Sequence, residues 1–221
     1  TDGFLDTATK VHCIILKDID TKQILHLNNE EAVKKLEQAE LIIGHNIIKF
    51  DIPVLKKFYN LKSRAKVFDT IVATRLLFPD IKDQDFKHKN FPRDCIGRHS
   101  LKAWGYRVGN YKEAFDTDWK TFSPAMLDYC VQDVEVTHSL FKMIENRGYS
   151  KQAMELEHNV AQLIYKQERH GFTFDKEKAQ QLYSKLNARR AELEEEFQKL
   201  FKPITTKRIS PKTGKQLKDK I

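Results

Sequence analysis

The order of apolar and polar residues predicts that the chain begins with strands. Residues 11–16 form a nearly unbroken apolar run with β-branched side chains, which is typical of a buried strand. The polar residues 18–22 follow as a turn, and residues 23–27 alternate between polar and apolar positions, so these segments predict a hairpin. A further short strand is predicted at residues 41–43, where the apolar run stops at Gly44.

Helical patterns lie between and after these strands, and capping residues mark where the helices begin. Asn28 or Asn29 is suited to cap the first helix, and Asp69 or Thr70 is suited to cap the third. Residues 80–97 are polar and have no clear periodicity, so we expect an exposed loop there. The predicted helices cover residues 29–39, 51–59, 71–77, 100–104 and 124–146.

Strands that alternate with helices indicate an α/β domain over residues 1–148. The pattern then changes to two long helices, residues 151–169 and 175–201, of which the second is dense in Lys, Arg and Glu. Residues 202–221 are basic and poor in large apolar groups, and their proline and glycine residues break any helix. We therefore expect a second, helical region with a basic tail over residues 149–221.

The charge, the apolar runs and the cysteines of the chain limit which classes of protein it can belong to. Lys and Arg outnumber Asp and Glu by 39 to 31, and the resulting charge of +8 suits a nucleic acid partner as well as a merely basic protein. No apolar run approaches the roughly 18 residues of a transmembrane helix, and the start of the chain lacks the pattern of a signal peptide. The 3 cysteines are widely scattered, which argues against a zinc ribbon or disulfide scaffold and favours a reducing compartment.

The first candidate site is the segment that runs from Gly44 to Pro53. A short apolar strand ends at a glycine, the polar residues His45 and Asn46 follow, and Asp51 stands where a helix begins. A carboxylate at this position is equally explained as a helix N-cap, and the two polar residues as loop residues that bond the local backbone.

The second candidate site lies within the predicted helix over residues 124–146. Tyr129 and Asp133 are four residues apart, so they share one face of that helix. A phenol beside a carboxylate is suited to hold a metal ion and orient its water. The alternative is a surface aspartate that accepts a hydrogen bond from a half-buried tyrosine.

Taken together, these two segments resemble the second and third motifs of the proofreading 3′–5′ exonucleases, in the tyrosine-bearing branch of the DEDD superfamily. Residues 68–77 also look like that family, in which the Asp-Thr pair serves the start of a helix rather than a metal. Residues 97–107, 166–175 and 210–215 are similar to segments of the family A replicative DNA polymerases of short-tailed phages.

The resemblance implies an RNase H-like exonuclease fold, an α/β architecture with a mixed sheet flanked by helices, followed by the helical beginning of a polymerase thumb region. It implies four carboxylates that bind two Mg²⁺ or Mn²⁺ ions, with Asp51 and Asp133 as two of them and Tyr129 as the residue that orients water. His45 and Asn46 are candidate contacts to the terminal nucleotide or its phosphate, although loop structure explains them equally well. Phe50, Trp104 and Tyr106 are candidates to stack on unpaired bases, although most of them are expected to belong to the core.

This sequence departs from the family pattern at its start. Family members read Asp-x-Glu followed directly by a segment like Thr-Asp-Gly, and this chain begins at Thr1-Asp2-Gly3 without an initiator methionine. We therefore expect the first strand and its two carboxylates to lie upstream, and we assign no metal to Asp2 or Asp6. The 221-residue chain is accordingly expected to be inactive or nearly so as a nuclease.

The resemblance also implies partners and a place in the cell. These are DNA with a single-stranded 3′ end, the rest of a polymerase chain, and a host processivity factor such as thioredoxin bound through other regions, in the cytoplasm of a bacterial host. Two alternatives stay open: a fragment that binds single-stranded DNA without cutting it, and an exoribonuclease of the same superfamily. Residues 166–175 argue against the second, because they look like the entry to a polymerase thumb.

Overall fold

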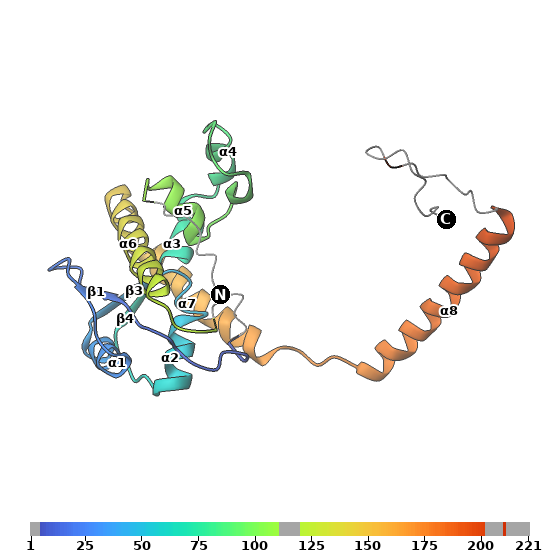
Figure 1. Ribbon diagram of the computed structural model, residues 1–221, viewed down its shortest axis with the longest axis horizontal. Coiled ribbons are helices and arrows are strands. Elements are labelled where there is room, and N and C mark those ends of the chain that lie inside the picture. Colours follow the sequence, from blue (N-terminus) through green and yellow to red (C-terminus); the bar gives the residue numbers. More distant parts are fainter. Residues whose placement is uncertain (1–4, 111–119, 202–209, 211–221) are drawn as a thin grey trace. The chain divides into compact units, whose positions relative to one another are not determined.

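The computed structural model describes residues 5–110, 120–201 and 210 (Figure 1). The strands are β1 (Leu16–Lys17), β2 (Ile24–Leu25), β3 (Leu41–Gly44) and β4 (Lys66–Asp69). The helices are α1 (Asn29–Gln38), α2 (Asp51–Tyr59), α3 (Thr70–Leu77), α4 (Ile81–Asp85), α5 (Leu101–Arg107), α6 (Pro124–Arg147), α7 (Lys151–His170) and α8 (Lys176–Leu200), with a 3₁₀ turn at Arg93–Cys95. Small sheets flanked by helices confirm the predicted α/β class.

The described strands form two separate two-stranded sheets. β1 and β2 pair antiparallel, which confirms the predicted hairpin, and β3 and β4 pair in parallel with Gly44 opposite Asp69. The first strand is shorter than the predicted run over residues 11–16, because only Leu16 of that run belongs to a ladder. Within the described part of the chain, residues 11–15 have no strand partner that would extend it.

Side-chain caps begin the helices where the sequence predicts. The Asn28 side chain accepts a hydrogen bond from the Glu31 N–H at 2.9 Å, and the Glu31 carboxylate accepts one from the Asn28 N–H at 3.3 Å, which is a complete capping box. Asp69 caps α3 by accepting the Ile71 N–H at 3.1 Å, and Ser123 caps α6. These starts depend on residues within three positions of each cap, so the local sequence is sufficient to set them.

The segment over residues 80–97 is not the exposed loop that its composition predicts. It contains α4 and the 3₁₀ turn, and Asp85 is 2% exposed. Its carboxylate accepts two hydrogen bonds from the Arg107 guanidinium, at 2.9 and 2.7 Å, and one from the Gly97 N–H at 2.8 Å. This ion pair joins α4 to α5, which continues through the buried Gly105 instead of ending there.

The main apolar core lies where α3 contacts both α6 and α7, with α5 packed against α6. Its buried members are Ala73, Phe78, Ile81, Trp104, Leu140, Ile144 and Met154. Trp104, which the sequence left open as a base-stacking residue, is only 1% exposed and therefore belongs to this core.

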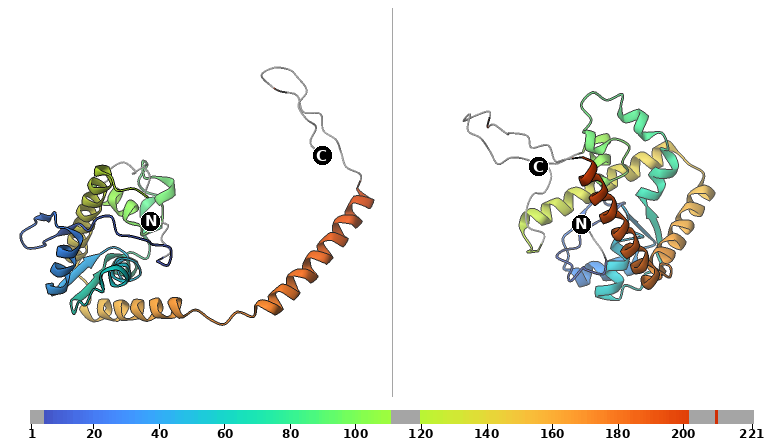
Figure 2. Two further views of the ribbon diagram at one scale, coloured as in Figure 1. Left: turned by 60° about the horizontal axis from the view of Figure 1, so that its bottom comes forward. Right: turned by 90° about the vertical axis from the view of Figure 1, so that its right-hand side faces the viewer.

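The first compact unit extends to His170, beyond the domain boundary predicted at residue 148. α7 belongs to this unit, and both views of Figure 2 show it running alongside the sheet and its helices. Met154 and His158 of α7 are buried, at 4% and 7% exposure. α7 therefore packs within the first compact unit, and the division into an exonuclease domain and a polymerase region at residue 148 stays a prediction.

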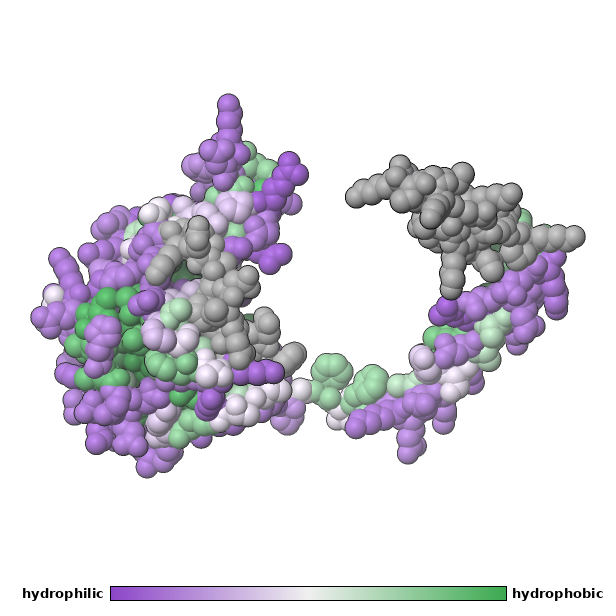
Figure 3. All heavy atoms as spheres, viewed as in Figure 1, coloured by the Kyte–Doolittle hydropathy of each residue, from purple (hydrophilic) through white to green (hydrophobic). Residues whose placement is uncertain are grey.

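The second unit begins at Gly171 and contains α8. This helix buries none of its side chains, and apolar groups reach its surface (Figure 3). Their spacing places them along one side of the helix. They are Leu182, Leu186, Leu193, Phe197 and Leu200.

None of the described helices is long and apolar enough to cross a membrane. Apart from Ser210, the basic tail predicted at residues 202–221 lies outside the described residues.

Candidate active site

The parallel strands β3 and β4 end side by side at one edge of their sheet. Gly44 ends β3 opposite Asp69, which ends β4, so the residues that follow the two strands meet at this edge. A Cβ atom at Gly44 would lie 2.5–3.0 Å from the Ile47 side chain, and glycine therefore allows the chain to turn back closely over the strand end. The turn leads directly to Asp51, the first residue of α2.

Asp69 fixes this turn. Its carboxylate is 1% exposed and accepts hydrogen bonds from three backbone N–H groups: Asn46 at 2.7 Å, Ile48 at 3.1 Å and Ile71 at 3.1 Å. Asn46 adopts a left-handed conformation with φ of 62°, which asparagine tolerates better than most residues. Burial raises the pKa of Asp69, and the three N–H donors act in the opposite direction. The sequence predicted the helix cap but not the bonds to the turn.

His158 of α7 makes a hydrogen bond with the backbone of Asp69. The Asp69 backbone N–H donates to His158 Nε2 at 2.8 Å, and His158 Nδ1 lies 2.8 Å from the Met154 carbonyl oxygen. Because Nε2 accepts a hydrogen bond, the ring proton is assigned to Nδ1, which donates to that carbonyl. α7 therefore helps to hold the strand end in place.

His45 is tied to the start of α3. The Thr70 hydroxyl donates to the Gly44 carbonyl oxygen at 3.2 Å, so its oxygen accepts from His45 Nδ1 at 2.8 Å. His45 Nε2 is buried without a hydrogen-bond partner among the described residues. Burial lowers the pKa of His45 to about 4, the charges of His99 and Arg75 act in the same direction, and the His99 backbone opposes them. The ring is thus neutral at physiological pH.

Asp51 occupies a different environment from Asp69. The N-cap of α2 is Phe50, which makes no side-chain capping bond, and so Asp51 is not a plain N-cap. Solvent reaches its side chain, yet the surrounding protein removes enough hydration to raise the pKa of Asp51 to about 6, and the charge of Asp69 adds to this shift. A carboxylate that is accessible and electrostatically unsatisfied is suited to bind a cation.

Asp133 lies within electrostatic reach of Asp51. Burial raises the pKa of Asp133 to about 6, and the charge of Asp51 contributes in the same direction. Both carboxylates also act on Cys130, which lies one turn before Asp133 on α6. Tyr129 lies four residues before Asp133 on the same helix and is half-buried. The fold thus brings the two predicted carboxylates to one place from distant parts of the sequence.

Comparison with known proteins identifies the family. The family model described as 3′–5′ exonuclease matches residues 6–148. The chain belongs to this 3′–5′ exonuclease family. It is 31% identical to the DNA-directed DNA polymerase of Escherichia phage T7 and 31% identical to that of Enterobacteria phage T3, in both cases over 98% of this chain and 39% of the relative. The chain therefore spans about two fifths of the length of these relatives, and it carries the exonuclease domain of phage family A DNA polymerases.

The exonuclease family implies dependence on divalent metal ions, and the donor atoms of this site fit such ions. Asp51 and Asp133 offer hard oxygen ligands, and Mg²⁺ is commonly held by one or two carboxylates while it keeps several waters. Within the residues that the structure describes, no group of three or more His, Cys, Asp or Glu side chains is gathered for a metal. The donor atoms of Asp51 and Asp133 are thus of the kind that a hydrated divalent cation accepts.

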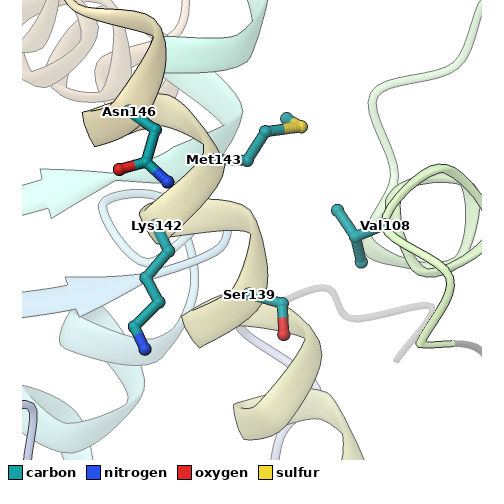
Figure 4. A pocket seen from close by; sticks show the side chains of 5 residues that line it. All are labelled: Val108, Ser139, Lys142, Met143 and Asn146. Atoms are coloured by element: carbon teal, nitrogen blue, oxygen red, sulfur yellow. The ribbon is translucent and has the colours of Figure 1, made fainter.

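A pocket elsewhere on α6 is separate from these carboxylates (Figure 4). It lies between the later turns of α6 and the residue that follows α5, and its lining includes neither candidate carboxylate. The lining residues are Val108, Ser139, Lys142, Met143 and Asn146. This pocket is not part of the candidate metal site of the exonuclease domain.

Sequence reasoning did not find the residues that support the site from distant elements. His158 carries no motif that distinguishes it from other histidines of the chain, and His99 lies in the segment over residues 97–107, whose resemblance to polymerases assigns it no role at this site. A buried position on the apolar face of α7 was the available signal for His158, but that position does not reveal its partner. Phe50 and Asn46 lie in the turn between β3 and α2.

Proposed function

We propose that this chain is the proofreading part of a phage DNA-directed DNA polymerase and removes nucleotides one at a time from the 3′ end of DNA, with a preference for single strands. The observation that carries the proposal is that Asp51, at the start of α2, and Asp133, on α6, lie within electrostatic reach of each other, with the pKa of each raised. Like charges held together without neutralising partners favour a cation between them. Membership of the exonuclease family supports the choice of reaction.

The metal ions of the complete site are proposed to be two Mg²⁺ or Mn²⁺ ions, with Asp51 and Asp133 among their ligands. Two such cations stabilise both the attacking and the leaving oxygen of a phosphodiester displacement. Because a ligating carboxylate must be ionised, the raised pKa values imply that metal binding weakens as the pH falls below about 6.

Four other residues are proposed to act on the substrate and the water. The hydroxyl of Tyr129 would hold the attacking water beside Asp133, from the preceding turn of α6. Asn46 and Phe50 are proposed to contact the terminal nucleotide, because they lie in the turn that leads into Asp51. His45, which precedes Asn46 in the same turn, is the third candidate contact.

The direct test is substitution of the two carboxylates. Asp51→Ala and Asp133→Ala are each expected to lower Mg²⁺-dependent release of 3′-terminal nucleotides by about three powers of ten or more, because each removes a metal ligand. Asp128→Ala is the matched control, since Asp128 is an exposed aspartate of the same helix and should leave the rate within about twofold. The assay uses a labelled single-stranded oligonucleotide and both the native polymerase chain and the 221-residue chain. Unchanged activity of both variants of the polymerase chain would refute the assignment.

A smaller loss is expected for Tyr129→Phe. This substitution keeps the ring and removes only the hydroxyl, so the metal ligands stay intact and only the positioning of water suffers. We expect a decrease of roughly ten- to a hundredfold in the maximal rate with little change in substrate binding. Equal losses for Tyr129→Phe and Asp133→Ala would instead assign the tyrosine a role in holding the metal.

The remaining part of the polymerase is proposed as the partner of the helical region, residues 149–221. The exposed apolar side of α8 is suited to be covered by further protein, and both phage relatives are more than twice the length of the match. We further propose that a host processivity factor such as thioredoxin acts through other regions of that polymerase, in the cytoplasm of the bacterial host. Limited proteolysis of the longer chain should protect α8, whereas cleavage there as fast as in the 221-residue chain would contradict this docking.

A further inference from the structure

Two cysteines that are far apart in sequence meet beside the candidate active site. The sulfur atoms of Cys13 and Cys130 lie 3.6 Å apart, although 117 positions separate the residues. Cys13 belongs to the extended segment before β1, and Cys130 lies on α6 immediately after Tyr129. Both are half-buried and within the first compact unit. The metal-binding role proposed above uses neither thiol.

We propose that Cys13 and Cys130 form a reversible oxidation site that closes to an intramolecular disulfide when the protein meets hydrogen peroxide. A disulfide requires the sulfurs to approach to about 2.05 Å, a movement of about 1.5 Å from their present separation. We expect rotation of the two side chains to supply this movement. The third cysteine, Cys95, is 1% exposed and is not paired with either of them.

The two thiols are not equivalent, and this decides which one reacts first. In the neutral pair the Cys13 S–H donates to Cys130 Sγ. When Cys13 is ionised the Cys130 S–H can donate to the thiolate instead, which lowers the pKa of Cys13 to about 7, so an appreciable fraction is thiolate at neutral pH. The pKa of Cys130 is raised by its bond to Cys13, by burial and by the charges of Asp133 and Asp51. Cys13 is therefore the nucleophile and Cys130 the thiol that resolves the product.

The reaction balances in two steps. The Cys13 thiolate attacks one oxygen of hydrogen peroxide, which breaks the O–O bond, forms the sulfenic acid of Cys13 and releases hydroxide. Cys130 then loses its proton and attacks the Cys13 sulfur, and the sulfenic oxygen leaves as water. Two electrons pass from the thiols to the peroxide. A small oxidant suits this site because both sulfurs are half-buried.

The crosslink would tie the segment before β1 to the turn of α6 that carries Tyr129 and precedes Asp133. It closes a long loop, which reduces the entropy of the unfolded chain. We expect the melting temperature of the oxidised protein to rise on the order of 5–10 °C.

The test treats the folded 221-residue chain with a small excess of hydrogen peroxide, blocks the remaining thiols and maps the peptides by mass spectrometry. The expected result is a peptide pair joined through Cys13 and Cys130 that has lost two hydrogen atoms, with Cys95 recovered as a free thiol. Dithiothreitol should restore all the thiols. Cys95→Ser is the matched control and should leave crosslinking unchanged, whereas Cys13→Ser and Cys130→Ser should each abolish it.

Several outcomes would overturn the proposal. They are oxidation of both cysteines to separate acids without a crosslink, disulfides between molecules in place of the internal one, and equal crosslinking of Cys95. Because the wild-type peptide map alone decides between these results, the test does not depend on the folding of any variant. It also requires no nuclease activity, so its failure would leave the proposed exonuclease function intact.

Discussion

Asp69 and the pair formed by Asp51 and Asp133 lie in the same region of the protein but in opposite environments. Asp69 is almost completely buried, and its carboxylate is met by three backbone N–H groups. Asp51 and Asp133 are more accessible, and among the described residues neither one forms an ion pair. The first environment satisfies a negative charge with fixed donors, whereas the second leaves charges that a cation would satisfy.

This difference separates Asp69 from the two candidate metal ligands without reference to any motif. A buried acid that accepts several N–H bonds stabilises the fold, because those donors would otherwise lose their partners. An accessible pair of acids with raised pKa values destabilises the metal-free fold when both are ionised. The two classes therefore predict stability changes of opposite sign upon neutralisation, and the following variants test this.

The largest change in stability is expected for Asp69→Asn. Both oxygens of Asp69 accept backbone N–H groups, and an amide would place its NH₂ against one of these donors. We expect the free energy of unfolding to fall by about 3 kcal/mol. Urea denaturation measures this, with Asn28→Ala as a control that removes an exposed helix cap and should cost only about 1 kcal/mol. If both variants lowered the free energy of unfolding equally, the hydrogen bonds from Asn46 and Ile48 to Asp69 would add no stability beyond that of a helix cap.

A smaller change of opposite sign is expected for Asp51→Asn and Asp133→Asn. Each folded-state pKa of about 6 lies above the usual aspartate value of 3.8, so the favourable contribution is present below about pH 4 and is lost as the pH rises through 6. Without metal at pH 7.5, each variant should be more stable than the wild type by about 1 kcal/mol, after allowance for solvent screening. The gain should disappear near pH 4.

Thermal denaturation in EDTA and in Mg²⁺ checks this second expectation. Mg²⁺ should stabilise the wild type and have little effect on either variant, because the ion binds only the folded protein with both carboxylates present. Asp128→Asn serves as the control on the same helix, with no change expected in either buffer. A loss of stability in EDTA for both site variants would place these residues in the same structural class as Asp69.

The smallest effect is expected for His45→Gln, and it concerns the slope of stability against pH. The pKa of His45 is lowered to about 4, so the unfolded chain takes up a proton below about pH 6.5 that the folded protein does not. Stability from this residue is thus lost as the pH falls from 6.5 towards 4, opposite to the trend for the two aspartates. The variant should reduce this acid-side loss by about 0.5–1 kcal/mol. His26→Gln, at an exposed histidine, should leave the slope unchanged.

Much of the local structure could be predicted from the sequence. The hairpin, the capping box at Asn28 and the long helix that begins after Ser123 follow from residues close together in the chain. The resemblance to exonuclease motifs selected Asp51, Tyr129 and Asp133, and the fold places the two carboxylates within reach of each other. Their roles in metal binding and catalysis remain predictions.

Predictions failed where a segment depends on distant partners. Residues 80–97 have the composition of a loop, but Arg107 gives Asp85 a buried partner and so stabilises compact structure there. The run at residues 11–16 has the composition of a strand, but a strand also needs a neighbour to bond, and the ladder covers only its end. The composition of a segment indicates which local structure it favours, whereas the burial of its side chains depends on the elements that pack against it.

The sequence by itself determined the helix starts, the hairpin and the candidate carboxylates, because caps, turns and motifs act over a few residues. Only the tertiary structure decided that His158 supports Asp69 across 89 positions and that Cys13 meets Cys130 across 117. Such pairs form when the chain closes long loops around a shared core, and many other pairings have similar local preferences. The native pairing forms because whole helices and strands bury their apolar faces against one another only in that arrangement. No single residue specifies this arrangement.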